Sequence, residues 1–165
     1  MTNKLNRPLL AAVLPAAMLI PAAPAAAQGS PTYEYAAKFV CAASSNLTPP
    51  VAVGHYYTAV NVHNPGIDVK VAWKVALAGT ILPGKITGFD SQLLKNDEAM
   101  EIDCRSIRNR ITASGLPNPA AFFTGFVVIR APAPVDVVSV YTASAQVNGP
   151  VVSIHTERVP ARQLP

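Results

Sequence analysis

The most constraining feature of this sequence is the segment FVVIRAPAPVDVVSVYTAS at residues 126–144, in which two apolar, β-branched runs flank Pro132 and Pro134. β-branched runs of this length favour strands, and proline interrupts a central ladder because it has no amide hydrogen to donate. We therefore expect residues 122–131 and 135–143 to form adjacent strands joined at the prolines. Apolar residues occupy both parities of the second run, which predicts a strand covered on both faces or lying at a contact between subunits.

Further segments show the two-residue alternation of half-buried strands. They are residues 33–43, 55–63, 69–77, 98–104 and 151–159. In residues 69–77, Val71 and Trp73 share one parity and Lys74 the other, which places the lysines in water. Short strands at close spacing, separated by Pro, Gly and Asn turn signals, predict an all-β fold, an antiparallel β-sandwich of about seven or eight strands.

Helical spacing is confined to residues 91–111. Residues 91–100 and 105–111 could each form a helical turn, and Ile107 and Ile111 are spaced to lie on one helix face. We expect one short helix, placed after Cys104.

The N-terminal segment, residues 1–27, has the three parts of a cleaved secretory signal of bacterial type. Lys4 and Arg7 precede an apolar run at residues 9–20, and three alanines end at Ala27. That run is shorter than the roughly 20 apolar residues that a spanning helix needs, so we expect no stable membrane anchor after cleavage. Residues 28–165 are then a single β-sandwich domain that is exported, either to the periplasm or to the extracellular space.

Charge and composition argue against two classes of protein, nucleic-acid-binding proteins and intrinsically disordered chains. Loss of Lys4 and Arg7 with the signal lowers the formal net charge from +4 to +2, and the basic residues that remain are scattered. Their one cluster, Arg105, Arg108 and Arg110, is too small to track phosphates, so we expect no nucleic-acid partner. Only 13% of residues are charged and 50% are hydrophobic, which argues against an intrinsically disordered chain.

The two cysteines, Cys41 and Cys104, both share parity with apolar neighbours and so point inward. A disulfide between them requires that their strands be neighbours in the fold. Two buried free thiols, acting as small hydrophobic side chains, are the alternative. Export favours the disulfide, because oxidising compartments preserve such bonds.

Signals for catalysis or cofactor binding are weak. The histidines are His55, His63 and His155, and eight residues of one strand would separate the first two by about 26 Å, so we expect no metal and no cofactor. Nucleophile elbows and phosphate-binding glycine loops are missing from the sequence.

An acidic group is the densest polar feature of the sequence. It consists of Asp97, Glu98, Glu101 and Asp103. Paired carboxylates could perform acid/base chemistry if one were buried while its partner stayed ionised. The alternative is a solvated charge run that blocks edge pairing of a strand.

Four segments carry a resemblance to known proteins: YYTAVNVHNPG, EAMEIDC, FFTGFVVIRAPAPVDVVSVYTA and TERVPAR. In this order they resemble blocks of a group of small exported bacterial proteins of unknown function. The succession of an N-x-x-N-P strand end, an amphipathic strand, GFVVI and a valine-rich strand is also remotely similar to the sensory rhodopsin transducer family. That resemblance implies a small β-sandwich that assembles into oligomers and binds ligands or partners.

Taken together, these patterns favour a non-enzymatic, exported structural or interaction module that forms a possible homo-oligomer and binds an unknown protein or small ligand. The candidate contact residues are Tyr56, Tyr57, Phe122 and Phe123, with core packing as the alternative for each. A small-ligand or carbohydrate-binding protein that uses the tyrosine pair and the acidic edge is the second hypothesis. A hydrolase that uses the carboxylates of residues 97–103 is the third.

Overall fold

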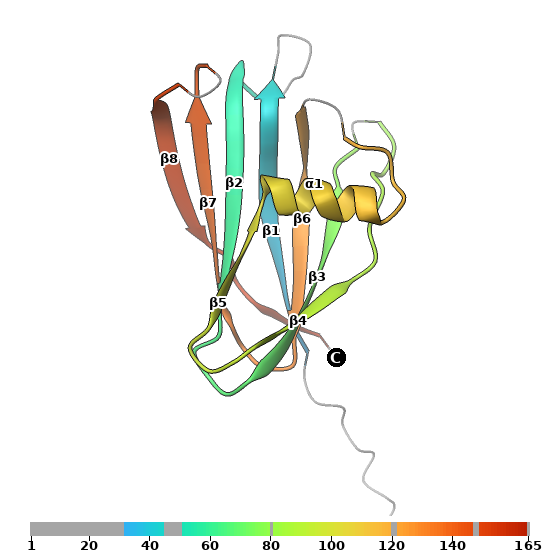
Figure 1. Ribbon diagram of the computed structural model, residues 1–165, viewed down its shortest axis with the longest axis vertical. Coiled ribbons are helices and arrows are strands. Elements are labelled where there is room, and N and C mark those ends of the chain that lie inside the picture. Colours follow the sequence, from blue (N-terminus) through green and yellow to red (C-terminus); the bar gives the residue numbers. More distant parts are fainter. Residues whose placement is uncertain (1–31, 45–50, 80, 120–121, 147–148, 165) are drawn as a thin grey trace, which may run out of the picture.

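The computed structural model describes residues 32–44, 51–79, 81–119, 122–146 and 149–164, so the predicted signal at residues 1–27 lies outside the described residues. The described chain folds into nine strands and one helix (Figure 1). The elements are β1 (Thr32–Ser44), β2 (Gly54–His63), β3 (Val69–Leu77), β4 (Asp90–Leu94), β5 (Ala99–Asp103), α1 (Cys104–Ala113), β6 (Phe122–Ala131), β7 (Asp136–Ser144), β8 (Val151–Arg158) and β9 (Arg162–Leu164). Within these residues no helix is long and apolar enough to cross a membrane.

All nine strands belong to one antiparallel sheet that folds over on itself. Its order is β4-β3-β6-β1-β2-β7-β8, with β5 added to β2 and β9 added to β1. The two central strands pair only where Ala42–Ser44 of β1 meets Gly54–Tyr56 of β2. Beyond this short contact they separate, because β2 pairs with β5 over Ala59–His63 and β1 pairs with β9 over Thr32–Glu34. The result is two layers that enclose the core, which confirms the predicted all-β antiparallel sandwich with one short helix.

Two strands were not anticipated from the alternation of the sequence. Residues 91–94, which we expected to form part of a helical turn, belong to strand β4, and the three-residue β9 follows Pro160 and Ala161. β4 exposes four of its five residues, and its backbone forms hydrogen bonds with the free edge of β3. Edge pairing of this kind depends on the tertiary fold rather than on local residue preference, so it overrides a weak helical pattern.

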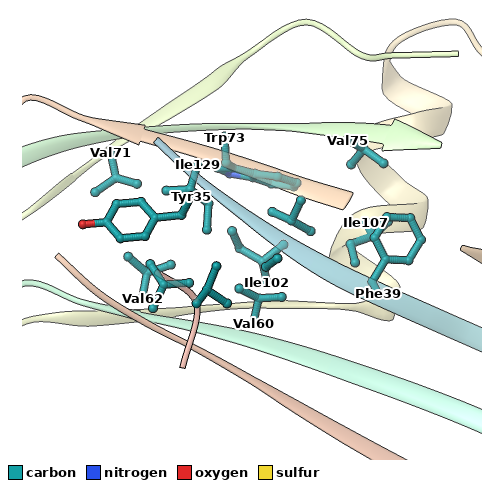
Figure 2. Packing of buried hydrophobic residues seen from close by; sticks show 14 of the residues in the cluster. Tyr35, Phe39, Val60, Val62, Val71, Trp73, Val75, Ile102, Ile107 and Ile129 are labelled. Carbon is teal, nitrogen blue, oxygen red and sulfur yellow. The ribbon is translucent and has the colours of Figure 1, made fainter. Parts of the chain in front are cut away.

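The core follows the predicted parities closely. Tyr35 and Phe39 of β1, together with Trp73 of β3, point between the layers, and Val60 and Val62 of β2 face them (Figure 2). The lysines of alternate parity on β3 point away from the core.

Gly125 allows the closest approach inside this core. A Cβ atom at Gly125 would lie 2.2 Å from the carbonyl oxygen of Ala76 and 2.8 Å from the ring of Phe39. The absence of a side chain at Gly125 therefore leaves the space that the Phe39 ring and the Ala76 carbonyl occupy.

Helix α1 begins where the sequence predicts it and crosses in front of β1 and β6 (Figure 1). Asp103 is its N-cap and accepts a hydrogen bond from the backbone N–H of Ser106 at 2.7 Å. Ile107 and Ile111 are fully buried and close one end of the core. The first helical residue, Cys104, forms a disulfide with Cys41 of β1, which confirms the predicted bond and fastens the helix to the sheet.

Strand β7 differs from one expectation. Its inward residues Val137 and Ser139 are buried, but Val138 and Val140 on the opposite face are only half-buried. The neighbouring edge strand β8 is exposed along its whole length. Within the described chain β7 is therefore not covered on both faces, because no second layer lies over its outer side. The alternative, a contact between subunits at this face, stays a prediction.

Candidate functional site

The four predicted contact aromatics lie in different environments. Phe123 is buried in the core, where its ring packs edge-on against Phe39 at 5.7 Å between ring centroids. The prediction that Phe123 is an exposed contact residue is therefore wrong, because its side chain lies on the inward side of β6. Tyr56 and Phe122 are half-buried and pack against each other at 6.2 Å. Tyr57 is the one exposed member of the set, with 44% of its surface accessible.

Tyr57 is held at the boundary of β5 and α1. Its hydroxyl donates a 2.6 Å hydrogen bond to Oδ2 of Asp103, the residue that caps the helix. Partial burial, together with the adjacent carboxylate, raises the pKa of the Tyr57 hydroxyl to about 12. Burial would raise the pKa of Asp103, but the Tyr57 hydroxyl and the Ser106 amide outweigh it and lower that pKa. Tyr57 thus stays protonated and acts as a donor to Asp103.

The four carboxylates of the acidic group do not converge. Asp97 and Asp103 lie near opposite ends of β5, where Asp97 is 2.9 Å from the imidazole of His63 and Asp103 caps α1. Glu98 accepts a hydrogen bond from the backbone of Lys95, and Glu101 is exposed. In the described ranges, no three His, Cys, Asp or Glu side chains are grouped so that they could hold a metal ion.

The three histidines also lie apart. His63 contacts both Asp97 and Asp136, and the hydrogen bond that its imidazole donates to Asp97 is the main cause that raises the pKa of His63. His155 stacks on Tyr141 at 6.0 Å between centroids. His55 lines a cavity of about 310 Å³ together with Tyr56 and Tyr57.

The arginine cluster is mostly engaged in local contacts. Arg108 donates to the side chain of Asn118 and to the carbonyl of Pro119, and Arg110 donates to the carbonyl of Gly88. Arg105 remains exposed at the start of the helix. These residues therefore fasten loops to α1 rather than forming a cationic patch.

A concentration of positive charge occurs elsewhere, on the outer side of the layer formed by β9, β1, β6, β3 and β4. The strand register places three successive rows of side chains on this side, because residues directly opposite in antiparallel strands share a face. The rows are Lys38–Phe126–Ala76–Ile86, Ala36–Val128–Lys74 and Arg162–Glu34–Arg130–Ala72–Ser91, followed by the pair Lys70–Leu93. We call this side the cationic face.

Two exposed aromatic rings form cation–π contacts with three of the cations on this face. The ammonium of Lys38 lies 5.1 Å from the ring centroid of Phe126, and the ammonium of Lys74 lies 4.8 Å from that of Phe89. The guanidinium of Arg130 lies over the same Phe89 ring at 5.0 Å. Folded proteins hold about one significant cation–π contact per 70–80 residues, so three on one face of one sheet are a local concentration.

The charge of this face is strongly unbalanced. Among the residues that the structure describes, five cations share it with one carboxylate. The cations are Lys38, Lys70, Lys74, Arg130 and Arg162. That carboxylate, Glu34, is 4% exposed and accepts hydrogen bonds from Arg130 at 2.7 Å and from Arg162 at 2.9 Å. Burial would raise the pKa of Glu34, but the two arginines outweigh it and hold the pKa below the ordinary value of 4.5. The face therefore keeps a formal excess of four positive charges.

Alternation alone had already placed the lysines of residues 69–77 in water. What it could not show is that Lys38 of β1 and Arg130 of β6 lie beside them, since this depends on which strands are neighbours. The aromatic residues Phe89 and Phe126 were missed for the same reason. The sequence did offer one signal for this face: Lys70 and Lys74 are four residues apart, so both lie on the outward side of the same strand.

Comparisons with known proteins identify no relative from which a role could be transferred. The sequence matches no protein-family model and no curated protein. Among solved structures the chain is similar to the crystal structure of Thermotoga maritima 1070, with 8% sequence identity and a TM-score of 0.48 over 80% of this chain and 94% of that chain. A function is therefore inferred from the geometry of this chain alone.

Proposed function

We propose that this protein is an exported, non-enzymatic interaction module that binds an anionic partner through the cationic face. The observation that carries the proposal is the excess of four positive charges on one side of one sheet, where Glu34 is already neutralised by Arg130 and Arg162. Clustered charge of one sign attracts a partner of opposite sign and accelerates its association. The remaining cations, Lys38, Lys70 and Lys74, form no ion pair with the described residues, so their charges can meet such a partner.

The structure around the cations favours binding over catalysis. Lys38 and Lys74 are held against aromatic rings, which restricts their side chains before a partner arrives. Ordering a long side chain in advance lowers the entropy lost on association. The carboxylates that could serve as acid and base in a hydrolase lie apart, around Asp97 and Asp103.

Export is part of the proposal and has two supports. Residues 1–27 have the layout of a cleaved secretory signal. The Cys41–Cys104 disulfide is the second support, since such bonds form and persist in oxidising compartments outside the cytosol.

The test is charge reversal with a matched control. The variant Lys38→Glu/Lys74→Glu changes the cationic face, whereas Lys95→Glu/Arg105→Glu changes the net charge equally at exposed positions on the β4–β5 turn and the helix. Binding to immobilised dextran sulfate, a soluble polyanion, is measured by interferometry at low and at high salt. We expect the first variant to lose at least tenfold in affinity and the control to lose much less. Equal losses would mean that net charge, and not this face, governs binding.

A second candidate is the binding of a small ligand or carbohydrate at the cavity beside the tyrosine pair. This cavity of about 310 Å³ is lined by His55, Tyr56 and Tyr57 from β2 and by residues 142–144 of β7. Aromatic rings with nearby polar groups are suited to sugars, and the volume fits a small ligand. A thermal-shift screen with glycans tests it, and an unmoved unfolding midpoint across the screen would exclude this candidate.

A further inference from the structure

Large apolar side chains border the cationic face along one stretch of chain, from residue 81 to residue 93. Ile81 and Leu82 are the most prominent, with 94% and 76% of their surface exposed. Ile86, Phe89 and Leu93 are exposed as well, and the bridge between Ile86 and Ala76 places Ile86 on the same side as Phe126. We call this stretch the apolar border. Exposed apolar side chains gathered in one place mark a contact with a partner or a membrane.

The tip of the apolar border projects from a closed loop. Leu77 donates its backbone N–H to the carbonyl of Lys85, and a Cβ atom at Gly84 would lie 1.9 Å from the carbonyl oxygen of Leu77. The two arms of the loop are thus in contact at its base. Ile81 and Leu82 lie between these arms in the sequence, and their side chains are open to solvent.

The apolar border and the cationic face adjoin along β3 and β4. Lys70 pairs with Leu93 across the two strands, and Lys74 lies over the ring of Phe89. A partner that meets the cations therefore also meets large apolar side chains. A hydrophilic polyanion would neutralise the charges but leave the apolar border in water, whereas the boundary of an anionic bilayer offers phosphate and hydrocarbon together.

We propose that the protein binds peripherally to an anionic lipid surface, with the cationic face at the headgroups and Ile81 and Leu82 inserted at the acyl boundary. This inference rests on the proposed function and names the partner of the same face. Charge complementarity selects an anionic surface, and the apolar border selects a lipid surface over a soluble polymer. The protein lies on the membrane and does not span it.

The binding free energy divides into two contributions that can be tested separately. Each cation near an anionic bilayer strengthens binding about fivefold at moderate salt. Replacing Lys38 and Lys74 by glutamine should therefore weaken binding by about 25-fold. Each exposed Ile or Leu that leaves water should contribute about tenfold, so Ile81→Ser/Leu82→Ser should weaken binding by about 100-fold.

The experiment uses protein expressed from the full sequence. The probes are vesicles of pure phosphatidylcholine and vesicles in which roughly a third of the lipid is phosphatidylglycerol, whose headgroup supplies the negative surface potential that attracts Lys and Arg. Co-sedimentation gives the partition constant for the unchanged protein, Lys38→Gln/Lys74→Gln and Ile81→Ser/Leu82→Ser. Two double-substitution controls alter cationic and apolar residues elsewhere: Lys95→Gln/Arg105→Gln, and Val152→Ser/Ile154→Ser on the distant edge strand β8. All substituted apolar side chains are exposed, so thermal unfolding should change little and loss of binding will not reflect misfolding.

The inference predicts binding to the anionic vesicles, much weaker binding to pure phosphatidylcholine, and loss in both face variants but in neither control. Parallel measurements with dextran sulfate separate this inference from the proposed function. Binding to dextran sulfate without binding to vesicles would overturn the lipid inference and leave the anionic partner as a soluble polymer or an acidic protein. Vesicle binding that Ile81→Ser/Leu82→Ser does not reduce would also overturn it. Failure to bind either probe would overturn both proposals.

Discussion

Removal of the Cys41–Cys104 disulfide should destabilise the protein by about 4 kcal/mol at 25 °C. The two cysteines are 63 positions apart, so the bond closes a loop of about 64 residues that contains β2, β3, β4 and β5. In the chain-entropy treatment, closing a loop of this length lowers the entropy of the unfolded chain by about 14 to 15 cal/mol/K. Multiplied by temperature, that entropy corresponds to the stated loss of stability.

The substitution needs care, because Sγ of Cys104 also accepts a hydrogen bond from the backbone N–H of Thr58 at 3.2 Å. We would use Cys41→Ala/Cys104→Ser, in which a hydroxyl can still accept that bond. Cys41 is fully buried, so the alanine adds a small cavity cost to the entropic loss. Urea unfolding at equilibrium, with and without reductant, compares the variant with the unchanged protein.

We expect the urea midpoint to fall by about 2 to 3 M, taking a slope of about 1.5 to 2 kcal/mol/M for a domain of this size. The slope itself should rise, since the unfolded chain without the crosslink is more expanded and exposes more surface. Reductant should lower the midpoint of the unchanged protein toward that of the variant. A loss below about 1 kcal/mol, or a slope that does not change, would refute the view that the bond stabilises by restricting the unfolded chain.

Three further substitutions test the packing and the ion pairs. Glu34→Gln should cost about 1 to 3 kcal/mol at neutral pH, because it removes the charge that binds two partly exposed arginines. Because the fold lowers the pKa of Glu34, the contribution of this carboxylate to the free energy of unfolding is present above pH 4.5 and is lost as the pH falls through the lowered pKa. Urea unfolding in acid should therefore give the variant and the unchanged protein converging stabilities. Gly125→Ala should cost about 1 to 3 kcal/mol in the same assay, because the added methyl would force β6 away from β3. Ile107→Ala should cost about 2 to 4 kcal/mol and lower the thermal midpoint, since this side chain is fully buried beneath α1; an unchanged midpoint would contradict its place in the core.

The fold class was predictable because alternation is a local property. Parity assigned Phe39 and Cys41 to the core, and the structure agrees at both residues. Parity also directed Lys74 away from the core, which the structure confirms, although this side chain is half-buried over the ring of Phe89. Spacing placed Ile107 and Ile111 on the buried side of the helix in the same way. These assignments need only the two-residue period of a strand and the 3.6-residue period of a helix.

Other features depended on contacts that no local pattern encodes. Strand β4 forms because β3 has a free edge to pair with, and it replaces the helical turn that residues 91–94 suggest. Phe122 and Phe123 are consecutive, so they lie on opposite sides of β6. The register of β6 against β1 decides that Phe123 is in the core and Phe122 is half-buried. A one-residue slip moves every side chain of a strand to the other face, so prediction of contact residues from such a pair is unreliable.

The sequence by itself determined that this chain is a β-sandwich with its lysines turned outward and with two cysteines directed into one core. Only the tertiary structure decided that Lys38, Lys74 and Arg130 share one face, since they come from three strands that are far apart in the chain and adjacent in the sheet. The physical reason is that parity fixes which side of its own strand a residue occupies, whereas strand order and register fix its neighbours. Positive charge on one strand is a local solvated feature, whereas the same charge repeated across adjacent strands is concentrated on one side of the sheet.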